Sequence, residues 1–390
     1  MANSLNFNQC STLLASITAQ ATGRASLTPT NTSEFVSVAN TALLSGYDNL
    51  INAISQVLSK TIFSVRPYSR KFAGIYADSQ RYGNHVRKLQ MVDSNPEDDD
   101  RQKLEHGKSV DQQMVKKPEV LQTNFYGANV YQRCVTLFKD QLDVAFSSPE
   151  EFGRFIGMVV QNVSDQIEKD HEECARATLA NFIAGKVKCD PANVVHLVTE
   201  FNASSDTANV QSIEEIRNSG LYANFMKFAL ARIESVSEFM TERSTLYHVN
   251  IDNKPLARHT PKNKQKVYLH SKEMTHAKTT TFSTVFHDEY LKKVDYEPVN
   301  FWQSIKEPDK ISCAPSYIDS TGALVKGENT VVNNVFGVIF DEEALGYTTV
   351  NAWSASAPFN AKGGYTNTFW HFTDRYWNDF TENGVVLLLD

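Results

Sequence analysis

Cysteine is scarce in this chain. The five cysteines are an odd number spread over 390 residues, and no two of them form a CxxC pair. A zinc ribbon or a redox dithiol requires cysteines at such a spacing, so neither is expected. We predict buried free thiols, because an unpaired cysteine usually behaves as a small apolar side chain. The residues are Cys10, Cys134, Cys174, Cys189 and Cys313.

Long apolar runs and a surplus of basic charge are also missing. No segment holds about 18 uninterrupted apolar residues, and no basic leader precedes an apolar block at the N-terminus. We therefore expect a protein that does not associate with membranes and is made in a cytoplasm. The formal net charge of -7 disfavours a protein whose main task is to neutralise nucleic-acid phosphates. With 41% hydrophobic residues, the chain can bury a core in each of two or three domains.

The strongest signatures of enzyme chemistry are absent. The sequence has no GxxxxGK[ST] phosphate loop, GxGxxG fingerprint, HExxH helix or GxSxG elbow. The nearest approach to a metal cluster is DHEEC at 170–174, in which His171 and Cys174 would share a helical face. Zinc needs further ligands, and none follows at a workable spacing, so a solvated charged face is the simpler interpretation. We expect no catalytic, cofactor-binding or metal site, and no cofactor.

A nucleophilic cysteine is the other chemical possibility. Cys134 with a distant base, such as His248 or His287, would make a cysteine-type hydrolase, because thiolate chemistry needs a basic neighbour. Nothing in the spacing pairs these residues. Cys134 lies in the alternating stretch YQRCVTLF, which favours a strand with a small buried side chain there.

Residues 8–59 are predicted to form helical pieces separated by loops. Within 47–58, apolar side chains recur at three- and four-residue steps, which places them on one helical face. The breaker cluster TPTNTS at 28–33 detaches the first piece from the second. This pattern favours an arm over a compact domain.

Residues 61–118 are dense in charge and poor in large aliphatic side chains. The turn-like acidic cluster SNPEDDD at 94–100 lies near the middle, which predicts a long polar hairpin. A two-stranded excursion is not stable alone, so we expect it to rest on the rest of the chain or on a neighbouring subunit. Its basic side chains could contact nucleic acid, pair with acidic residues of another subunit, or be solvated. They are Arg66, Arg70, Lys71, Arg81, Arg87 and Lys88.

The clearest single element is a long helix over residues 149–184. The run SPEE at 148–151 supplies a serine N-cap, a proline at the first helical position and a glutamate that can complete a capping box. An apolar stripe continues on both sides of a charged patch at 168–173, which is expected to be solvated or paired with another element. Gly185 is the expected stop.

The remaining chain mixes helix and strand. An apolar stripe predicts a helix near 222–240, and KVYLH at 266–270 is strand-like. Further strands are expected over 331–340, 368–380 and 385–389, the last after a turn-like ENG.

Five stretches, none of them a chemical motif, occur in an order that resembles the major capsid proteins of tailed bacteriophages with the Hong Kong 97 fold. The similarity runs over nearly the whole chain and is strongest to the capsid proteins of small podophages. The stretches are TIFSVRPY (61–68), GKSVD (107–111), NFYGANVYQ (124–132), DQLDVAFSSPEE (140–151) and FDEEALG (340–346).

The resemblance implies an α+β Hong Kong 97-like capsid fold with named parts. These would be an N-terminal arm (1–60), an E-loop (61–120), a first part of the P-domain (121–194) with its spine helix (149–184), mainly the A-domain (195–330), and a C-terminal β-rich return to the P-domain (331–390).

The resemblance also implies a function: a structural, non-enzymatic major capsid protein that self-assembles into the icosahedral head around phage double-stranded DNA, without sequence-specific binding. Its partners would be sister copies in pentamers and hexamers, a separate scaffolding protein and a portal protein, and assembly would take place in the host bacterial cytoplasm. Residues 1–60 are too short and interrupted for the cleavable scaffolding segment of some relatives. Lys108 is one lysine available for the subunit crosslinking of others, but nothing identifies a site.

Three alternatives remain open. An encapsulin-like nanocompartment shell protein would share the fold without a phage origin. A cysteine-type hydrolase would need the pairing of Cys134 with a histidine. A nucleic-acid-binding protein would show strongly salt-dependent retention on DNA.

Overall fold

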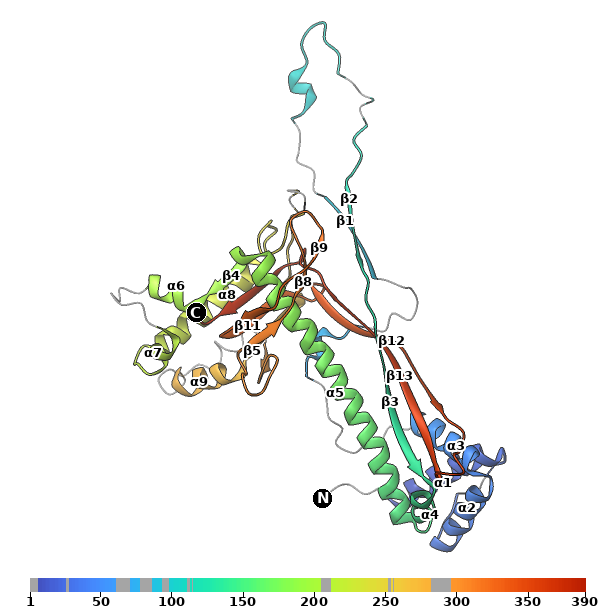
Figure 1. Ribbon diagram of the computed structural model, residues 1–390. Coiled ribbons are helices and arrows are strands. Elements are labelled where there is room, and N and C mark those ends of the chain that lie inside the picture. The colour runs from blue at the N-terminus through green and yellow to red at the C-terminus, as the bar shows by residue number, and fades with distance from the viewer. Residues whose placement is uncertain are drawn as a thin grey trace.

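In the computed structural model, one long helix links a cluster of short helices to a helix-covered sheet, and a hairpin projects away from both (Figure 1). The structure describes residues 6–25, 28–60, 71–77, 86–92, 98–110, 113, 115–204, 212–251, 254, 256–281 and 296–390.

The first helices are α1 (Phe7–Thr22), α2 (Thr32–Leu44) and α3 (Tyr47–Lys60), and the last confirms the helix predicted at 47–58. Their apolar faces share a core with the start of the long helix. The interpretation of this region as an arm without a compact core is therefore wrong for the described residues. Short amphipathic helices pack on one another, which a one-dimensional pattern does not reveal. Members of this core include Leu14, Ile17, Phe35, Leu50, Ile54, Phe146, Phe152 and Ile156.

The long helix, α5 (Pro149–Cys189), has 41 residues, or a length of about 61 Å at the usual rise per residue. It begins as predicted, with the Ser148 hydroxyl accepting a hydrogen bond from the Glu151 amide at 3.2 Å. The predicted stop at Gly185 is wrong, because the helix continues to its end at Cys189. A Cβ on Gly185 would lie 2.5 Å from Cζ of Phe380, so close packing explains the glycine.

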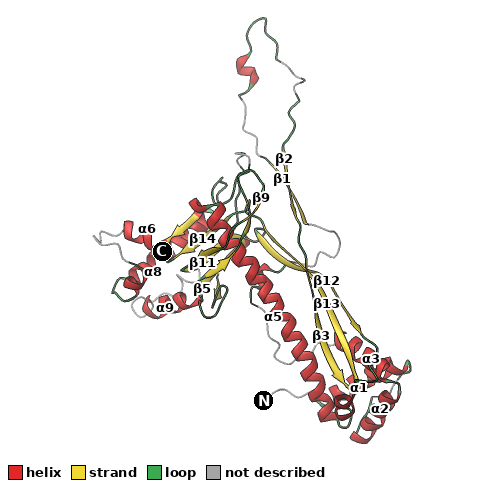
Figure 2. Cartoon of the chain, viewed as in Figure 1, coloured by secondary structure: helices red, strands yellow, loops and turns green. Residues whose placement is uncertain are grey.

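A three-stranded antiparallel sheet runs beside α5 (Figure 2). Its strand order is β12 (Leu345–Ser356), β13 (Tyr365–Asn378) and β3 (Asn129–Phe138), and α4 (Lys139–Ala145) leads from β3 towards α5. The sequence did not predict β12. Its residues 351–355 are all exposed, so they lack the alternation that marks a half-buried strand.

The second sheet has five strands, and helices cover both of its faces. Its central strand is antiparallel to both neighbours, whereas each outer strand is parallel to the strand beside it. The strand order is β4 (Val194–His196), β14 (Gly384–Leu388), β11 (Val335–Asp341), β5 (Gln265–His270) and β6 (Glu297–Val299). One face packs on the second half of α5. The other packs on α6 (Leu197–Ser204), α7 (Ile213–Arg217), α8 (Tyr222–Phe239) and α9 (Ser271–Thr281).

Alternate residues of a strand supply the two cores, as the pleat requires. In β14, Val386 packs in the core with α5, and Leu387 packs in the core with α8. The predicted stripe of α8 is confirmed, because Met226, Ile233 and Val236 are completely buried. Smaller pairs flank this body: β7 (Ile311–Cys313) with β10 (Thr330–Val332), and β8 (Ser316–Ile318) with β9 (Leu324–Lys326).

The C-terminal strands do not form one unit. After β11 the chain leaves the five-stranded sheet, forms β12 and β13, and returns as β14 through the turn at 379–384. The expectation that 331–390 forms a single β-rich return must be corrected, since β11 and β14 pair in the five-stranded sheet and β12 and β13 in the three-stranded sheet. Local patterns predict these strands but do not show which sheet each one joins.

The predicted hairpin is confirmed from residue 86 onwards, but Phe72 and Ile75, which the prediction placed in it, are buried in the core beside α5. Strand β1 (Val86–Met91) pairs antiparallel with β2 (Val120–Phe125), and η2 (Asp100–Lys103) lies near the tip. β2 continues through residues 126–128 into β3, so the hairpin extends an edge strand of the three-stranded sheet. Among the described helices, none combines the length and apolar character needed to span a membrane.

Candidate assembly surfaces

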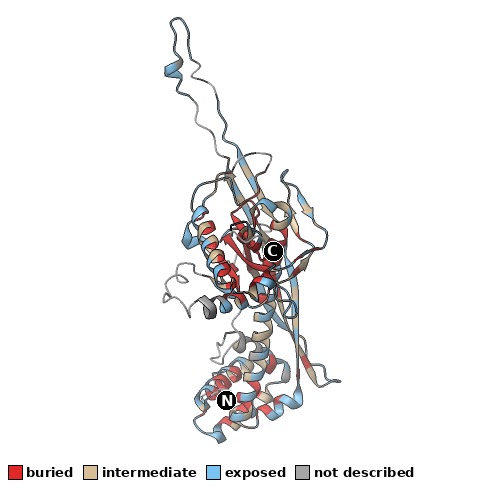
Figure 3. Ribbon diagram, turned by 90° about the vertical axis from the view of Figure 1, so that its left-hand side faces the viewer, coloured by how far each residue is buried: buried red, intermediate tan, exposed pale blue. Residues whose placement is uncertain are grey.

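The hairpin stands clear of the body and is largely exposed (Figure 3). Between residues 98 and 120, all side chains that the structure describes are exposed. The ion pairs near the tip join neighbours in sequence, Asp99 with Arg101 and Glu105 with Lys108. Exposed pairs of this kind contribute little stability. The described residues of the tip therefore form no core of their own.

The two faces of the β1–β2 ladder differ in chemistry. The pairs Leu89–Gln122 and Met91–Val120 put three apolar side chains on one face, which we call the outward face. Leu89, Met91 and Val120 are 56%, 67% and 57% exposed. Lys88 and Leu121 lie on the opposite face, which contacts the body.

Lys88 binds the root of the hairpin, which is the paired part at 86–91 and 120–125, to the turn at 379–384. Its Nζ lies 3.1 Å from Oδ2 of Asp379 and 3.4 Å from Oε2 of Glu343, and it donates a hydrogen bond to Glu382. Burial opposes the charge on Lys88, but the carboxylates of Asp379 and Glu382 outweigh it and raise the pKa of Lys88. The root is therefore held by a partly buried ionic cluster.

A second contact steadies the same root. Nζ of Lys254 lies 2.9 Å from Oε2 of Glu119. A small cavity of about 50 Å³ remains between β2 and the loop of the body beside it. It is lined by Val92, Glu119, Val120, Leu121, Ile251, Lys254 and Leu256.

The basic residues of the hairpin region differ in their contacts. None of the three possibilities, nucleic-acid contact, pairing with another subunit or solvation, describes Lys88, whose carboxylate partners belong to its own chain. Arg87 is exposed beside the outward face, and the Lys71 amide donates to Glu172 at 3.4 Å. Arg66, Arg70 and Arg81 lie outside the described residues.

The chain matches one known protein family over nearly its whole length. The model of the Phi29-like phage major capsid proteins matches residues 14–388. The chain belongs to this family. It is a capsid shell protein of a tailed-phage virion, which confirms the resemblance seen in the sequence. The family is one of structural proteins.

Solved structures show the same fold. A chain in the capsid structure of Staphylococcus phage Andhra is 10% identical with a TM-score of 0.54, and the match covers 84% of this chain and 86% of that one. A chain in the structure of the head fiber and inner core protein gp22 of native bacteriophage P68 is 9% identical with a TM-score of 0.54, over 85% and 87%. The α+β Hong Kong 97-like fold is confirmed. No curated protein matches the chain.

Membership in this capsid family does not favour the encapsulin-like or cysteine-hydrolase alternatives. Cys134 does lie on a strand, β3, but it is exposed, so its predicted burial is wrong. The alternation was interpreted with the right period and the wrong phase. His248 is buried and engaged with Asn383 and Leu256, and His287 lies outside the described residues.

The charged patch of α5 is largely paired. Nε of Arg133 donates to Asp170 at 2.7 Å, and Arg176 donates to Glu172 at 2.7 Å. The Arg176 guanidinium also lies 3.8 Å from the ring centroid of Phe301. Within the described part of the chain, no group of three His, Cys, Asp or Glu side chains could hold a metal ion.

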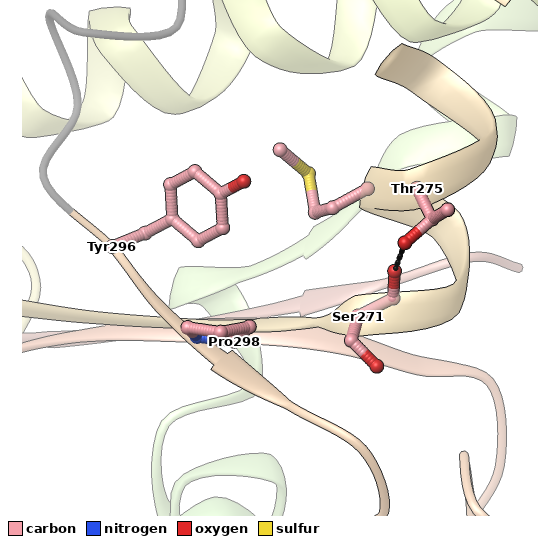
Figure 4. A pocket seen from close by; sticks show the side chains of 5 residues that line it. Ser271, Thr275, Tyr296 and Pro298 are labelled. Carbon is pink, nitrogen blue, oxygen red and sulfur yellow. Dashed lines mark hydrogen bonds between the residues drawn. The ribbon is translucent and has the colours of Figure 1, made fainter. Parts of the chain in front are cut away.

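One pocket lies beside α9, with a volume of about 320 Å³ (Figure 4). Ser271 and Thr275 come from α9, and Thr275 donates to the Ser271 carbonyl at 2.8 Å. Tyr296, Pro298 and Met274 complete the lining. Among the residues that the structure describes, this lining includes no carboxylate, imidazole or thiol.

Sequence reasoning identified neither the exposed apolar residues on the outward face of the hairpin root nor the carboxylates that bind its opposite face. The alternation KLQM at 88–91 was a usable signal for the outward face, because it places Leu89 and Met91 on one side of a strand. Nothing local marked the carboxylates that hold the opposite face, since Asp379 lies 291 residues from Lys88.

Proposed function

We propose that this capsid subunit joins sister copies into rings of five and six, which close into an icosahedral head. The observation that carries the proposal is the outward hairpin face, where Leu89, Met91 and Val120 are exposed although the opposite face is docked. Exposed apolar surface rimmed by polar residues typically marks a protein–protein contact. A hairpin lying across the next subunit makes a head-to-tail contact, and repeated contacts of that type close rings.

Weak individual contacts suffice for such a shell. A subunit bound at several places leaves only when all of its contacts release together. The described residues of the hairpin tip form no core of their own, so the ordering of the tip and subunit association are expected to be coupled.

The proposal extends to the named parts of the fold. Residues 1–60 are the N-terminal arm in position, packed as helices, and residues 61–120 are the E-loop. The spine helix is α5, which with β3, β12 and β13 makes the P-domain. The five-stranded sheet and its covering helices make the A-domain. The support is the separation of these elements into two sheets joined by α5.

The same proposal names the partners. A separate scaffolding protein and a portal protein would guide assembly in the host bacterial cytoplasm, and double-stranded DNA would be packaged without sequence-specific binding. The net charge of -7 supports the last point, because an acidic shell protein does not bind phosphates strongly.

The test places a charge on the outward face. Met91→Glu should leave the thermal unfolding of the dissociated subunit unchanged, because Met91 is 67% exposed, and should prevent rings and shells in negative-stain microscopy. Met91→Leu is the matched control and should assemble, since it keeps an apolar side chain of similar volume. Shells of Met91→Glu at the wild-type concentration would overturn the proposal.

A further inference from the structure

Four buried side chains form a continuous hydrogen-bonded chain beneath the hairpin root. His248 Nδ1 lies 3.0 Å from Asn383 Oδ1, and Asn383 Nδ2 lies 3.1 Å from Thr260 Oγ1. Thr260 Oγ1 lies 2.7 Å from Asp341 Oδ2. At the other end, His248 Nε2 lies 2.7 Å from the Leu256 carbonyl oxygen. The four side chains are between 0% and 7% exposed, so water does not compete for these contacts.

Counting hydrogens shows that this chain lacks one. The contacts need four hydrogens, but a neutral imidazole supplies one, the hydroxyl of Thr260 one, and the amide of Asn383 one along the chain. If Thr260 donates to ionised Asp341, Asn383 must turn its oxygen to His248, and both ring nitrogens then need a hydrogen. If His248 is neutral, the chain reverses and Oδ2 of Asp341 loses the hydrogen bond from Thr260, while Oδ1 keeps that from the Glu343 amide. One added proton completes every contact.

The charges around His248 determine the pH at which that proton binds. Burial lowers the pKa of His248, contacts with Asn383 and Leu256 oppose this, and the cations of Arg258 and Lys186 add to the lowering. Arg258 is paired with Glu382 on the turn at 2.9 Å, and Lys186 with Asp190 at 2.7 Å. The folded chain therefore takes up the proton at a lower pH than the unfolded chain, and stability falls as the pH drops below about 6.5.

The turn at 379–384 links this chain to the hairpin. It contributes Asn383 to the hydrogen-bonded chain and Asp379 and Glu382 to Lys88. We infer that His248, Asn383, Thr260 and Asp341 form a proton relay, which loads one proton in mild acid and thereby loosens the turn that holds the hairpin root. The added proton completes the hydrogen bonds of the chain, but it also places a positive charge near Arg258, which binds Glu382 and the Thr381 carbonyl of the turn, and this repulsion outweighs the completed contact. The relay lies within one subunit, so the inference is independent of the proposed shell.

The first test follows the His248 titration by NMR in the full-length dissociated subunit, with isotope-labelled histidine. Thr260→Val removes the hydroxyl, so Asn383 can turn its amide group to a neutral imidazole, and the His248 titration should shift down by about one pH unit. Thr260→Ser keeps the hydroxyl and should titrate like wild type. Equal titration of Thr260→Val and wild type would overturn the relay.

The second test measures backbone amide exchange at 86–91 and 379–384 at about pH 7.5 and about pH 5.5, corrected for intrinsic rates. Wild type should lose protection in acid. His248→Gln should lose less, and the remaining response measures Glu382 and the other carboxylates. His259→Gln, on an exposed neighbour in the same loop, should behave as wild type. The same loss in His248→Gln as in wild type would overturn the coupling.

Discussion

Gly185 marks a close approach between the long helix and the turn that follows β13. The Phe380 ring stacks on Phe182 with centroids 5.5 Å apart, and it lies directly over Gly185. A side chain at this position would push the stack away from the helix. Gly157 in the same helix has nothing within 4 Å of the position that a Cβ would occupy. Close packing therefore requires a glycine at position 185 but not at position 157.

Gly185→Ala should therefore destabilise the dissociated subunit by about 1–3 kcal/mol, because overpacking outweighs the better helix propensity of alanine. Gly157→Ala is the matched control and should gain about 0.5–1 kcal/mol. Denaturant unfolding followed by circular dichroism gives both values. A gain of stability in Gly185→Ala would show that the Phe380 ring can move away at little cost.

Lys88→Met should destabilise the subunit by about 2–4 kcal/mol, because it removes the cation from the buried carboxylate of Asp379 and one of the two cations that pair with Glu382. The raised pKa of Lys88 means that this contribution is fully present below about pH 10.4 and is lost as the pH rises further. Lys108→Met removes an exposed pair and should change stability by less than about 0.5 kcal/mol. Urea titration at neutral pH compares the two, and equal small effects would contradict the assignment.

At the scale of single elements, α5 depends on its first turn. The chain must reverse direction between α4 and α5, and Ser148 satisfies an amide that the helix leaves without a partner. The long helix connects both sheets and the N-terminal helices, so its starting point determines where the N-terminal core is placed.

Ser148→Ala should cost about 1 kcal/mol, the usual loss when an N-cap hydroxyl is removed. Ser147→Ala is its control, since Ser147 is exposed and donates only to the Val144 carbonyl. Thermal unfolding of the dissociated subunit should rank Ser148→Ala below Ser147→Ala. The reverse order would mean that the cap does not limit the stability of α5.

At the scale of the whole molecule, the chain combines two compact parts with one whose described residues form no core. We predict that trypsin cuts the dissociated subunit first near Arg101, Lys108 and Lys116 in the exposed tip, and that residues 7–60 resist because their helices share a core. Assembled shells should protect the tip. Mass spectrometry of the fragments identifies the sites. A tip that resists trypsin in dilute, dissociated subunits would contradict the coupling of tip order to assembly.

The sequence by itself determined the features that depend on neighbours along the chain. The cap at Ser148 and the apolar stripe of α8 follow from side chains within one or two helical turns of each other. The hairpin over 86–125 follows from the charged, turn-like composition of its own stretch. The order of these elements was also sufficient to indicate the capsid family, because that order is a property of the chain and not of its packing.

Only the tertiary structure decided the pairings between distant segments. It packed residues 7–60 into a core, turned Cys134 outward, divided the C-terminal strands between two sheets, and brought Asp379 to Lys88. The reason is physical: helix and strand periods are set by local backbone geometry, whereas the face that is buried and the partner of a charge depend on which distant segment the fold places opposite.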